Sequence, residues 1–261
     1  MNKMDIQKNI SINTTFTEKD RICRKFQMRK FNANKIVPAV TMQIEVNANE
    51  LLLERQRINT TSDVHVTIYS LLLKKIASVL IRYPLLYSLY YKKKIIASKR
   101  LMLHIPVSID NHVEYIFIQN PEKKSVKEIT SELQNDVLLV KQGKNSLMNA
   151  LKKMDKLKGL QALLYKKKCF KNPLYFIEHF YGNFPVTNFG TFNVTQGTMV
   201  LTEPLAGGLV IGKVRPNAVF EELSVNEPHY ITLSLAFDHR VMDGAYAGGF
   251  LTELKKEIEQ L

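Results

Sequence analysis

The sequence predicts a mixed fold of strands and helices, of the α/β or α+β class, in a single domain. Its 261 residues are enough for a substantial core, and 45% of them are hydrophobic. Segments with the two-residue alternation of strands are interspersed with segments of helical periodicity, without a strict βαβα repeat. No internal repeat or linker rich in Pro, Gly or Ser divides the chain. We therefore expect a polar arm over residues 1–20 and one domain over residues 21–261.

The first half of the chain alternates helical and extended segments. Val40, Met42 and Ile44 alternate with polar residues, which is typical of a half-buried strand. Asn47 is expected to cap the helix that follows this strand. The elements predicted in this half are a basic helix over residues 20–34, a strand over 37–46, helices over 49–58 and 64–82, and strands over 101–109 and 113–119.

The second half begins with helices and then becomes rich in strands. Ser125 is expected to cap an amphipathic helix with apolar residues at Val126, Ile129, Leu133 and Val137. The remaining predicted elements are a helix over 147–165, strands over 184–188, 198–203, 209–213 and 229–238, and a closing helix over 245–260.

The charge of the chain is strongly positive, with a formal net charge of +13 and lysine runs at residues 92–94 and 166–168. Clustered lysines can bind nucleic-acid phosphates by releasing counterions. However, the sequence contains no helix-turn-helix, zinc-finger or aromatic RNA-binding signature, and Lys, Asn and Ile are abundant throughout. We expect no nucleic-acid partner. A cofactor or carrier protein that bears phosphates accounts better for the charge.

Cysteine content and hydropathy predict a soluble, cytoplasmic protein. The two cysteines, Cys23 and Cys169, cannot form a disulfide framework, which suits a reducing compartment. The N-terminus has no apolar signal-peptide core. Lys74 and Lys75 interrupt the longest apolar stretch, so no membrane span is expected.

The residues with the clearest chemical potential follow the strand predicted over 229–238. His239 at the end of this strand could project into a cleft while the strand fixes its backbone, and imidazole can accept a proton near neutral pH. Asp243 could anchor the loop through a cation, and Gly244 would permit a tight turn. A structural interpretation remains open, because a histidine beside Asp238 can be a hydrogen-bonded pair and Asp-Gly is common turn chemistry.

Four segments, in the right order, resemble a known family. FDHRVMDGAYAGGFL contains His239, Asp243 and Gly244 in an HxxxDG pattern. The others are NFPVTNFGTFNV, LTEPLAGGLVIGKV, and RICRKFQM followed by IVPAVTMQIEV. Together they resemble the catalytic domain of the dihydrolipoamide acyltransferases, over roughly residues 21–261. Peptide-synthetase condensation domains carry a similar HxxxDG motif but are much longer. The resemblance implies an α/β fold like that of chloramphenicol acetyltransferase, a mixed sheet with flanking helices.

The resemblance also implies roles for individual residues. His239 would be the general base, and Thr187, supported by its neighbour Asn188, would donate its hydroxyl to the oxyanion. Asp243 would pair with an arginine of the first helix, which is Arg21 by its spacing from the following methionine. Arg24 is the alternative partner, because two extra residues precede the next strand.

The function implied is transfer of an acyl group, with acetyl as the expected one, from acyl-CoA to a hydroxyl or thiol acceptor in a biosynthetic pathway. One alternative is the core acyltransferase of a 2-oxoacid dehydrogenase complex with a separate lipoyl domain. Another is a non-enzymatic assembly protein that retains the fold. We expect no metal and no covalently bound lipoate, because Asp155-Lys156, which resembles a lipoylation motif, lies in a helical stretch.

The assembly implied by the resemblance is a homotrimer whose sites lie between subunits. The histidine would come from one subunit and the oxyanion donor from its neighbour. The acceptor would be a small molecule or a group bound to a carrier protein, and no larger cage is expected.

Overall fold

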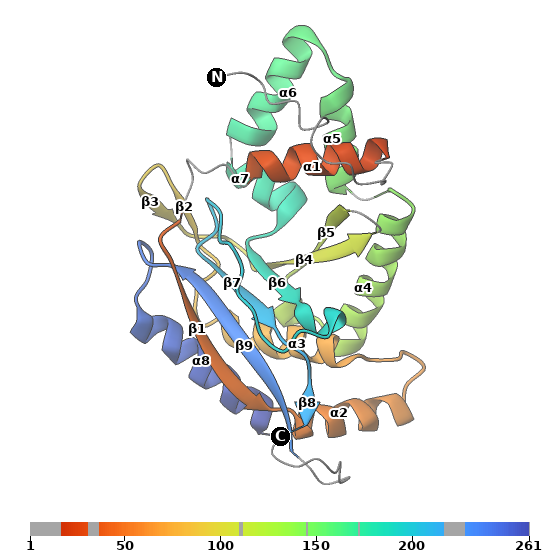
Figure 1. The fold of residues 1–261 in the computed structure, drawn as a ribbon, viewed down its shortest axis with the longest axis vertical. Coiled ribbons are helices and arrows are strands. Elements are labelled where there is room, and N and C mark those ends of the chain that lie inside the picture. Colours follow the sequence, from red (N-terminus) through yellow and green to blue (C-terminus); the bar gives the residue numbers. More distant parts are fainter. Residues whose placement is uncertain are drawn as a thin grey trace, which may run out of the picture.

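The structure, a computed structural model, describes residues 17–30, 37–109, 112–144, 146–171, 173–216 and 228–260. Its centre is a mixed sheet in the order β1-β9-β7-β6-β4-β5, with β8 paired to β9 (Figure 1). β6 is parallel to β4 and β7, and the other pairs are antiparallel. The bounds of these strands are β1 Ala39–Asn47, β4 Met102–Ile109, β5 His112–Gln119, β6 Phe184–Asn188, β7 Gly207–Ile211, β8 Arg215–Pro216 and β9 His229–Asp238.

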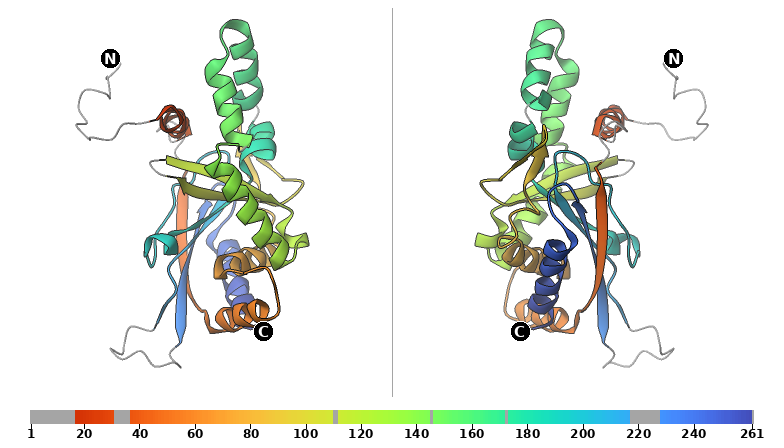
Figure 2. Two further views of the ribbon diagram at one scale, coloured as in Figure 1. Left: turned by 90° about the vertical axis from the view of Figure 1, so that its right-hand side faces the viewer. Right: turned by 90° about the vertical axis from the view of Figure 1, so that its left-hand side faces the viewer.

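Helices pack against one face of the long strands, as both views in Figure 2 show. α3 (Ile68–Leu80) is the most deeply buried of them, since Leu71, Leu73 and Ile76 are fully inaccessible. It begins at a capping box formed by Thr67 and Ser70. The other helices of this layer are α2 (Asn49–Thr60), α8 (Gly244–Glu259) and α4 (Val126–Lys141), which begins at Ser125 as predicted.

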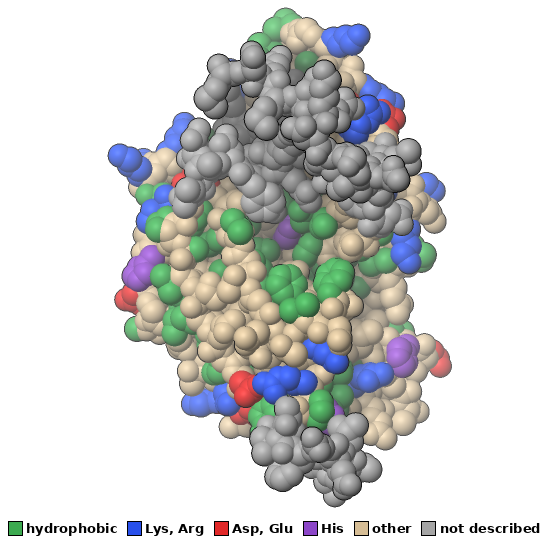
Figure 3. All heavy atoms as spheres, in the orientation of Figure 1, with side chains coloured by type: hydrophobic (Ala, Val, Ile, Leu, Met, Phe, Trp, Pro, Cys, Tyr) green, Lys and Arg blue, Asp and Glu red, His purple; other side chains and the backbone are tan. Residues whose placement is uncertain are grey.

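The opposite face of β1, β9 and β7 has no helical layer (Figures 1 and 2). In the same orientation, Figure 3 shows hydrophobic side chains near the middle of this face and most charged side chains toward its margins. Exposed apolar residues of the loop after β6 include Phe192, Val194 and Val200. A face with few charges and several exposed apolar side chains is typical of a surface that contacts another chain.

A second cluster of helices lies at the end of the molecule near β4 and β5. α5 (Ser146–Lys156) and α6 (Gly159–Lys171) form a hairpin that projects from the body (Figure 2). The remaining elements are α1 (Glu18–Lys30), α7 (Pro173–Phe176), the hairpin of β2 (Leu89–Tyr91) and β3 (Lys94–Ile96), and the short turns η2 (Pro121–Lys123), η3 (Ile177–Tyr181) and η4 (Phe189–Phe192).

Most predicted elements are confirmed, and two strands match the predicted bounds, namely β6 and β9. The helix predicted over 147–165 is wrong as a single element, because it breaks at Leu157 and Lys158, and α6 begins at Gly159 with a φ of +60°. The strand predicted over 198–203 is absent from this described segment. The cap of α2 also differs: Ala48 is the N-cap, although Asn47 does accept a hydrogen bond from the Asn49 N–H.

Candidate active site

His239 lies immediately after β9, where the chain turns toward α8. The strand fixes its backbone, since β9 is paired along its length with β1. The His239 N–H also donates to the carbonyl oxygen of Pro38 at 3.1 Å. Its side chain is exposed. An exposed imidazole on a fixed backbone can meet a substrate from outside the chain.

The two neighbours of His239 are bound to each other. Asp238 is fully buried and accepts hydrogen bonds from the Arg240 guanidinium, at 2.7 Å to Nη2 and 3.0 Å to Nε. Arg240 also donates to Glu203 at 3.0 Å and stacks on the ring of Tyr90, 4.0 Å from its centroid. Hydrogen bonds to Asp238 raise the pKa of Arg240 above its usual value. We call the bonds of Arg240 to Asp238 and Glu203 the clamp, because they hold the turn that carries His239. Sequence periodicity alone did not indicate the clamp.

Asp238→Asn is expected to lower the free energy of unfolding by about 3 kcal/mol, because it breaks a buried charged pair. The partial exposure of Arg240 keeps the loss from being larger. Urea unfolding followed by circular dichroism measures it. Glu203→Gln is the matched control, since this contact lies near the surface and is worth about 1 kcal/mol or less. Equal losses in the two variants would contradict the clamp.

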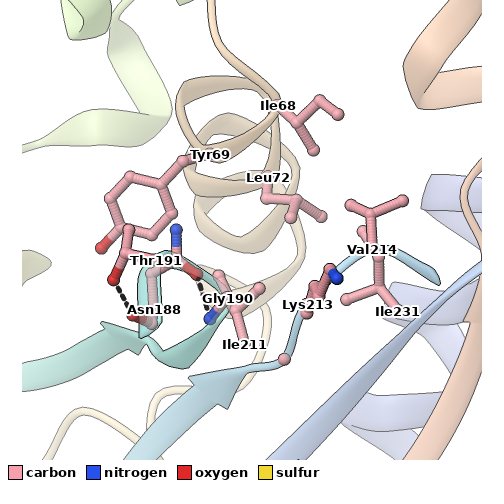
Figure 4. Close-up of a pocket in the computed structure, with 11 residues that line it drawn as sticks. Ile68, Tyr69, Leu72, Asn188, Gly190, Thr191, Ile211, Lys213, Val214 and Ile231 are labelled. Carbon is pink, nitrogen blue, oxygen red and sulfur yellow. Dashed lines mark hydrogen bonds between the residues drawn. The ribbon is translucent and has the colours of Figure 1, made fainter. Parts of the chain in front are cut away.

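Thr187 and Asn188 lie at the end of β6, where both line one cavity and Asn188 also lines a second, adjoining one. The Asn188 side chain accepts a hydrogen bond from the Gly190 N–H, and its carbonyl accepts one from the Thr191 hydroxyl, both at 2.9 Å (Figure 4). These bonds fix the turn after β6 and so hold Thr187 in place. Thr187 is half-buried, and no partner for its hydroxyl is recorded among the described residues.

The larger cavity, of about 940 Å³, lies between β4, β5, α4 and η4 and includes Thr187 in its wall. The smaller one, of about 310 Å³, lies beyond Asn188 and has Lys213 in its lining (Figure 4). Tyr69 lines both cavities; its hydroxyl donates to the Val186 carbonyl at 3.1 Å, and burial raises its pKa. Thr187 therefore lies on the wall of the larger cavity, and Lys213 lines the smaller cavity next to it.

Sheet register shows that His239 and Thr187 of one chain are far apart. Thr187 is the register partner of Val210 on β7, and Val210 is the register partner of Ser234 on β9. His239 lies five positions beyond Ser234 and two strands away from β6. With strand rises of about 3.3 Å and strand spacings of about 4.8 Å, the separation is roughly 19 Å. Groups that act on the same carbonyl must lie within a few ångströms of it, so one chain cannot supply both.

Asp243 is the N-cap of α8, and its side chain accepts a hydrogen bond from the Tyr246 N–H at 3.0 Å. Within the described part of the chain, no hydrogen bond or ion pair joins it to Arg21, which is exposed on α1. The side chain of Arg24 lies outside the described residues. Gly244 begins α8, and a Cβ there would meet nothing within 4 Å, so the expected tight turn is not what this glycine provides.

Because Asp243 acts as a helix cap, Asp243→Ala is expected to lower the free energy of unfolding by about 1 kcal/mol. Asp243→Asn keeps a capping oxygen and should change stability by a few tenths of a kcal/mol at most. Thermal unfolding of both variants tests this. A large, equal loss in both would instead indicate that the negative charge itself is required, as in a salt bridge.

A histidine at a strand end and a hydroxyl on a cavity wall are groups that acyl transfer requires, and comparison with known proteins indicates the same class. Residues 16–151 and 170–261 match the family model described as 2-oxoacid dehydrogenases acyltransferase (catalytic domain). The chain belongs to this family. The unmatched residues 152–169 fall in the projecting α5–α6 hairpin.

Individual relatives agree with this assignment. The chain is 24% identical, over 90% of its length and 52% of the relative, to the dihydrolipoyllysine-residue acetyltransferase component of the acetoin cleaving system of Bacillus subtilis. It is 39% identical, over 36% of its length and 22% of the relative, to the succinyltransferase component of the 2-oxoglutarate dehydrogenase complex of the same organism. The chain spans about half the length of the first relative.

A solved structure of a probable dihydrolipoamide acetyltransferase from Listeria monocytogenes superposes with a TM-score of 0.71 at 22% identity, covering 94% of this chain and 93% of that one. The predicted α/β fold is therefore confirmed. The predicted biosynthetic function is wrong, because these relatives are components of acetoin-cleaving and dehydrogenase systems, which agrees with the alternative interpretation. The HxxxDG motif could not distinguish the biosynthetic function from the dehydrogenase-complex function, since the motif indicates acyl transfer and not the identity of the acceptor.

Among the described residues, no group of three or more His, Cys, Asp or Glu side chains could hold a metal ion. None of the helices in the described ranges has both the length and the apolar character needed to cross a bilayer.

Proposed function

We propose that this chain transfers an acyl group between coenzyme A and a dihydrolipoyl group, as the catalytic domain of a 2-oxoacid dehydrogenase-type acyltransferase. Two observations support the proposal beyond family membership: Thr187 lies on the wall of a large cavity, and His239 is exposed on a turn held by the Asp238–Arg240 ion pair. Lys213, in the adjoining cavity, is a cation that suits a donor with a phosphorylated end.

In the proposed step, His239 removes the proton from the acceptor thiol, and the resulting thiolate attacks the carbonyl carbon of the acyl thioester. The carbonyl oxygen becomes an oxyanion that accepts a hydrogen bond from Thr187. When the tetrahedral intermediate collapses, the donor C–S bond breaks and the leaving thiolate takes the proton back from His239. One thioester is exchanged for another, so no metal or redox partner is needed.

The site would be completed by a second copy of the chain. The roughly 19 Å between His239 and Thr187 requires the two groups to come from different subunits if both act on one carbonyl. The side of the sheet without a helical layer, where few charged side chains lie, offers a surface for this contact (Figure 3). A trimer with closed symmetry would give three equivalent sites.

The test is an assay of the purified protein with acetyl-CoA and free dihydrolipoamide, followed by release of the CoA thiol, with light scattering to measure the mass in solution. We expect transfer to dihydrolipoamide, little transfer to hydroxyl acceptors, and the mass of a trimer. Absence of transfer with either acceptor would favour a non-enzymatic assembly role. A monomer with full activity would contradict the shared site.

A further inference from the structure

We propose that the larger cavity beside Thr187 selects neutral, aliphatic acyl groups and excludes carboxylated ones such as succinyl. This inference rests on the proposed function, because it treats Thr187 as the donor to the thioester carbonyl. It adds the chemical class of the acyl group. Family membership leaves that class open, since one relative is an acetyltransferase and another a succinyltransferase.

The walls of this cavity are mostly hydrocarbon. Ile105 of β4 and Ile116 of β5 are each 4% exposed, and Leu133 and Val137 of α4 face them across the space. The polar contributions are hydroxyl and amide groups, among them Thr67, Ser108, Gln134 and Thr191. None of the described residues that line the cavity has a charged side chain. The cavity is therefore suited to a neutral chain that extends from a thioester at Thr187.

A succinyl group would bring an ionised carboxylate into this space. A carboxylate that leaves water needs a cation or several hydrogen-bond donors, or its burial is strongly unfavourable. Lys213 lines the smaller cavity beyond Asn188 and not the larger one. The described residues of the cavity wall thus offer a carboxylated acyl group no cation.

The size of the cavity permits neutral groups larger than acetyl. Its volume of about 940 Å³ is at the upper end of the range for small-molecule sites, about 300–1,000 Å³. A branched acyl group could bury its methyl groups against Ile105, Val107 and Val137, and each buried methyl favours binding. We therefore expect the cavity to accept both acetyl and branched acyl groups.

The first experiment compares acetyl-CoA, isobutyryl-CoA and succinyl-CoA as donors to dihydrolipoamide. We expect kcat/KM for isobutyryl to be at least that for acetyl, and kcat/KM for succinyl to be lower by roughly 100-fold or more. In parallel, binding of S-isobutyryl- and S-succinyl-dihydrolipoamide to the His239→Ala protein is measured by calorimetry. Binding without turnover tests the cavity even if catalysis fails.

The second experiment changes the charge of the wall. Val137→Arg places a cation on the cavity side of α4 and should raise the succinyl-to-acetyl ratio of kcat/KM at least 10-fold. Leu139→Arg is the matched control, because Leu139 lies on the same helix, is 42% exposed and does not line the cavity. It should leave the ratio unchanged. Lys213→Gln should also leave this ratio unchanged, since that cation lies in the other cavity.

The outcomes separate the two proposals. No transfer from any donor, with isobutyryl-dihydrolipoamide still binding better than succinyl-dihydrolipoamide, would overturn the proposed function and support the cavity assignment. Transfer of succinyl as fast as acetyl would overturn the assignment and support the function. A Val137→Arg ratio equal to that of Leu139→Arg would also overturn it, because the added cation would then not face the acyl group.

Discussion

His239→Ala is expected to lower kcat by roughly 100-fold or more, which is the usual contribution of a positioned general base. The loss should appear in kcat at saturating substrate, because the imidazole acts on the thiol proton and not on binding. Folding should be unaffected, since the side chain is exposed and the hydrogen bond to Pro38 comes from the backbone. Steady-state kinetics and a thermal unfolding curve measure the two effects separately.

His229→Ala is the matched control for this variant. His229 begins the same strand, at the end of β9 remote from the clamp, and its backbone N–H is held by Asn49 at 2.8 Å. The control should keep the parent's kcat. If His239→Ala and the parent turn over at the same rate, His239 has no part in the chemistry, whatever its position in the fold.

Thr187→Ala is expected to lower kcat by roughly 100- to 1,000-fold, the usual effect of removing one oxyanion donor. Thr187→Ser retains the hydroxyl and should recover most of the rate, whereas Thr187→Val fills the same space without a donor and should not. A merely structural role would give the opposite order, because valine preserves the packing of the strand better than alanine does. The order of the three variants is therefore the decisive measurement.

The shared site allows a further test with the same two variants. His239→Ala and Thr187→Ala proteins should each be nearly inactive alone, yet trimers refolded from an equal mixture should regain activity. About one interface in four then pairs an intact His239 with an intact Thr187 from the next chain. Mixed trimers, verified by differently tagged chains, that regain no activity would show that the two residues do not share a site.

Local sequence determined most elements of this protein. Alternation of apolar and polar residues predicted β1 and β9. The apolar residues of each strand pack on the helices, and the polar residues point to the face that has no helical layer. The serine and glutamate at the start of α4 form a capping box, a local device that requires only Ser125 and Glu128. The HxxxDG segment and its companion blocks indicated the chemistry, since those residues lie together in the chain.

The errors of sequence reasoning have tertiary causes. Residues 198–203 contain a short apolar run, Met199 to Leu201, but form no strand of the described sheet, and strand formation depends on pairing with a neighbour. The family resemblance implied a pair of Asp243 with Arg21, or alternatively with Arg24, whereas in the structure Asp243 caps α8 and Arg21 lies on α1, which packs against α5 and β5. Family resemblance identified acyl transfer but did not decide between free and lipoyl acceptors.

Only the tertiary structure decided how the site is built. The sheet order β9-β7-β6 separates His239 from Thr187, although both were predicted from motifs, and this separation is why the proposed site needs a second chain. Arg240 meets Glu203 and Tyr90 because three distant segments converge beside the end of β9. The uncharged cavity likewise forms where α4, two strands and η4 meet. Each depends on contacts between residues far apart in the chain, which local periodicity does not encode.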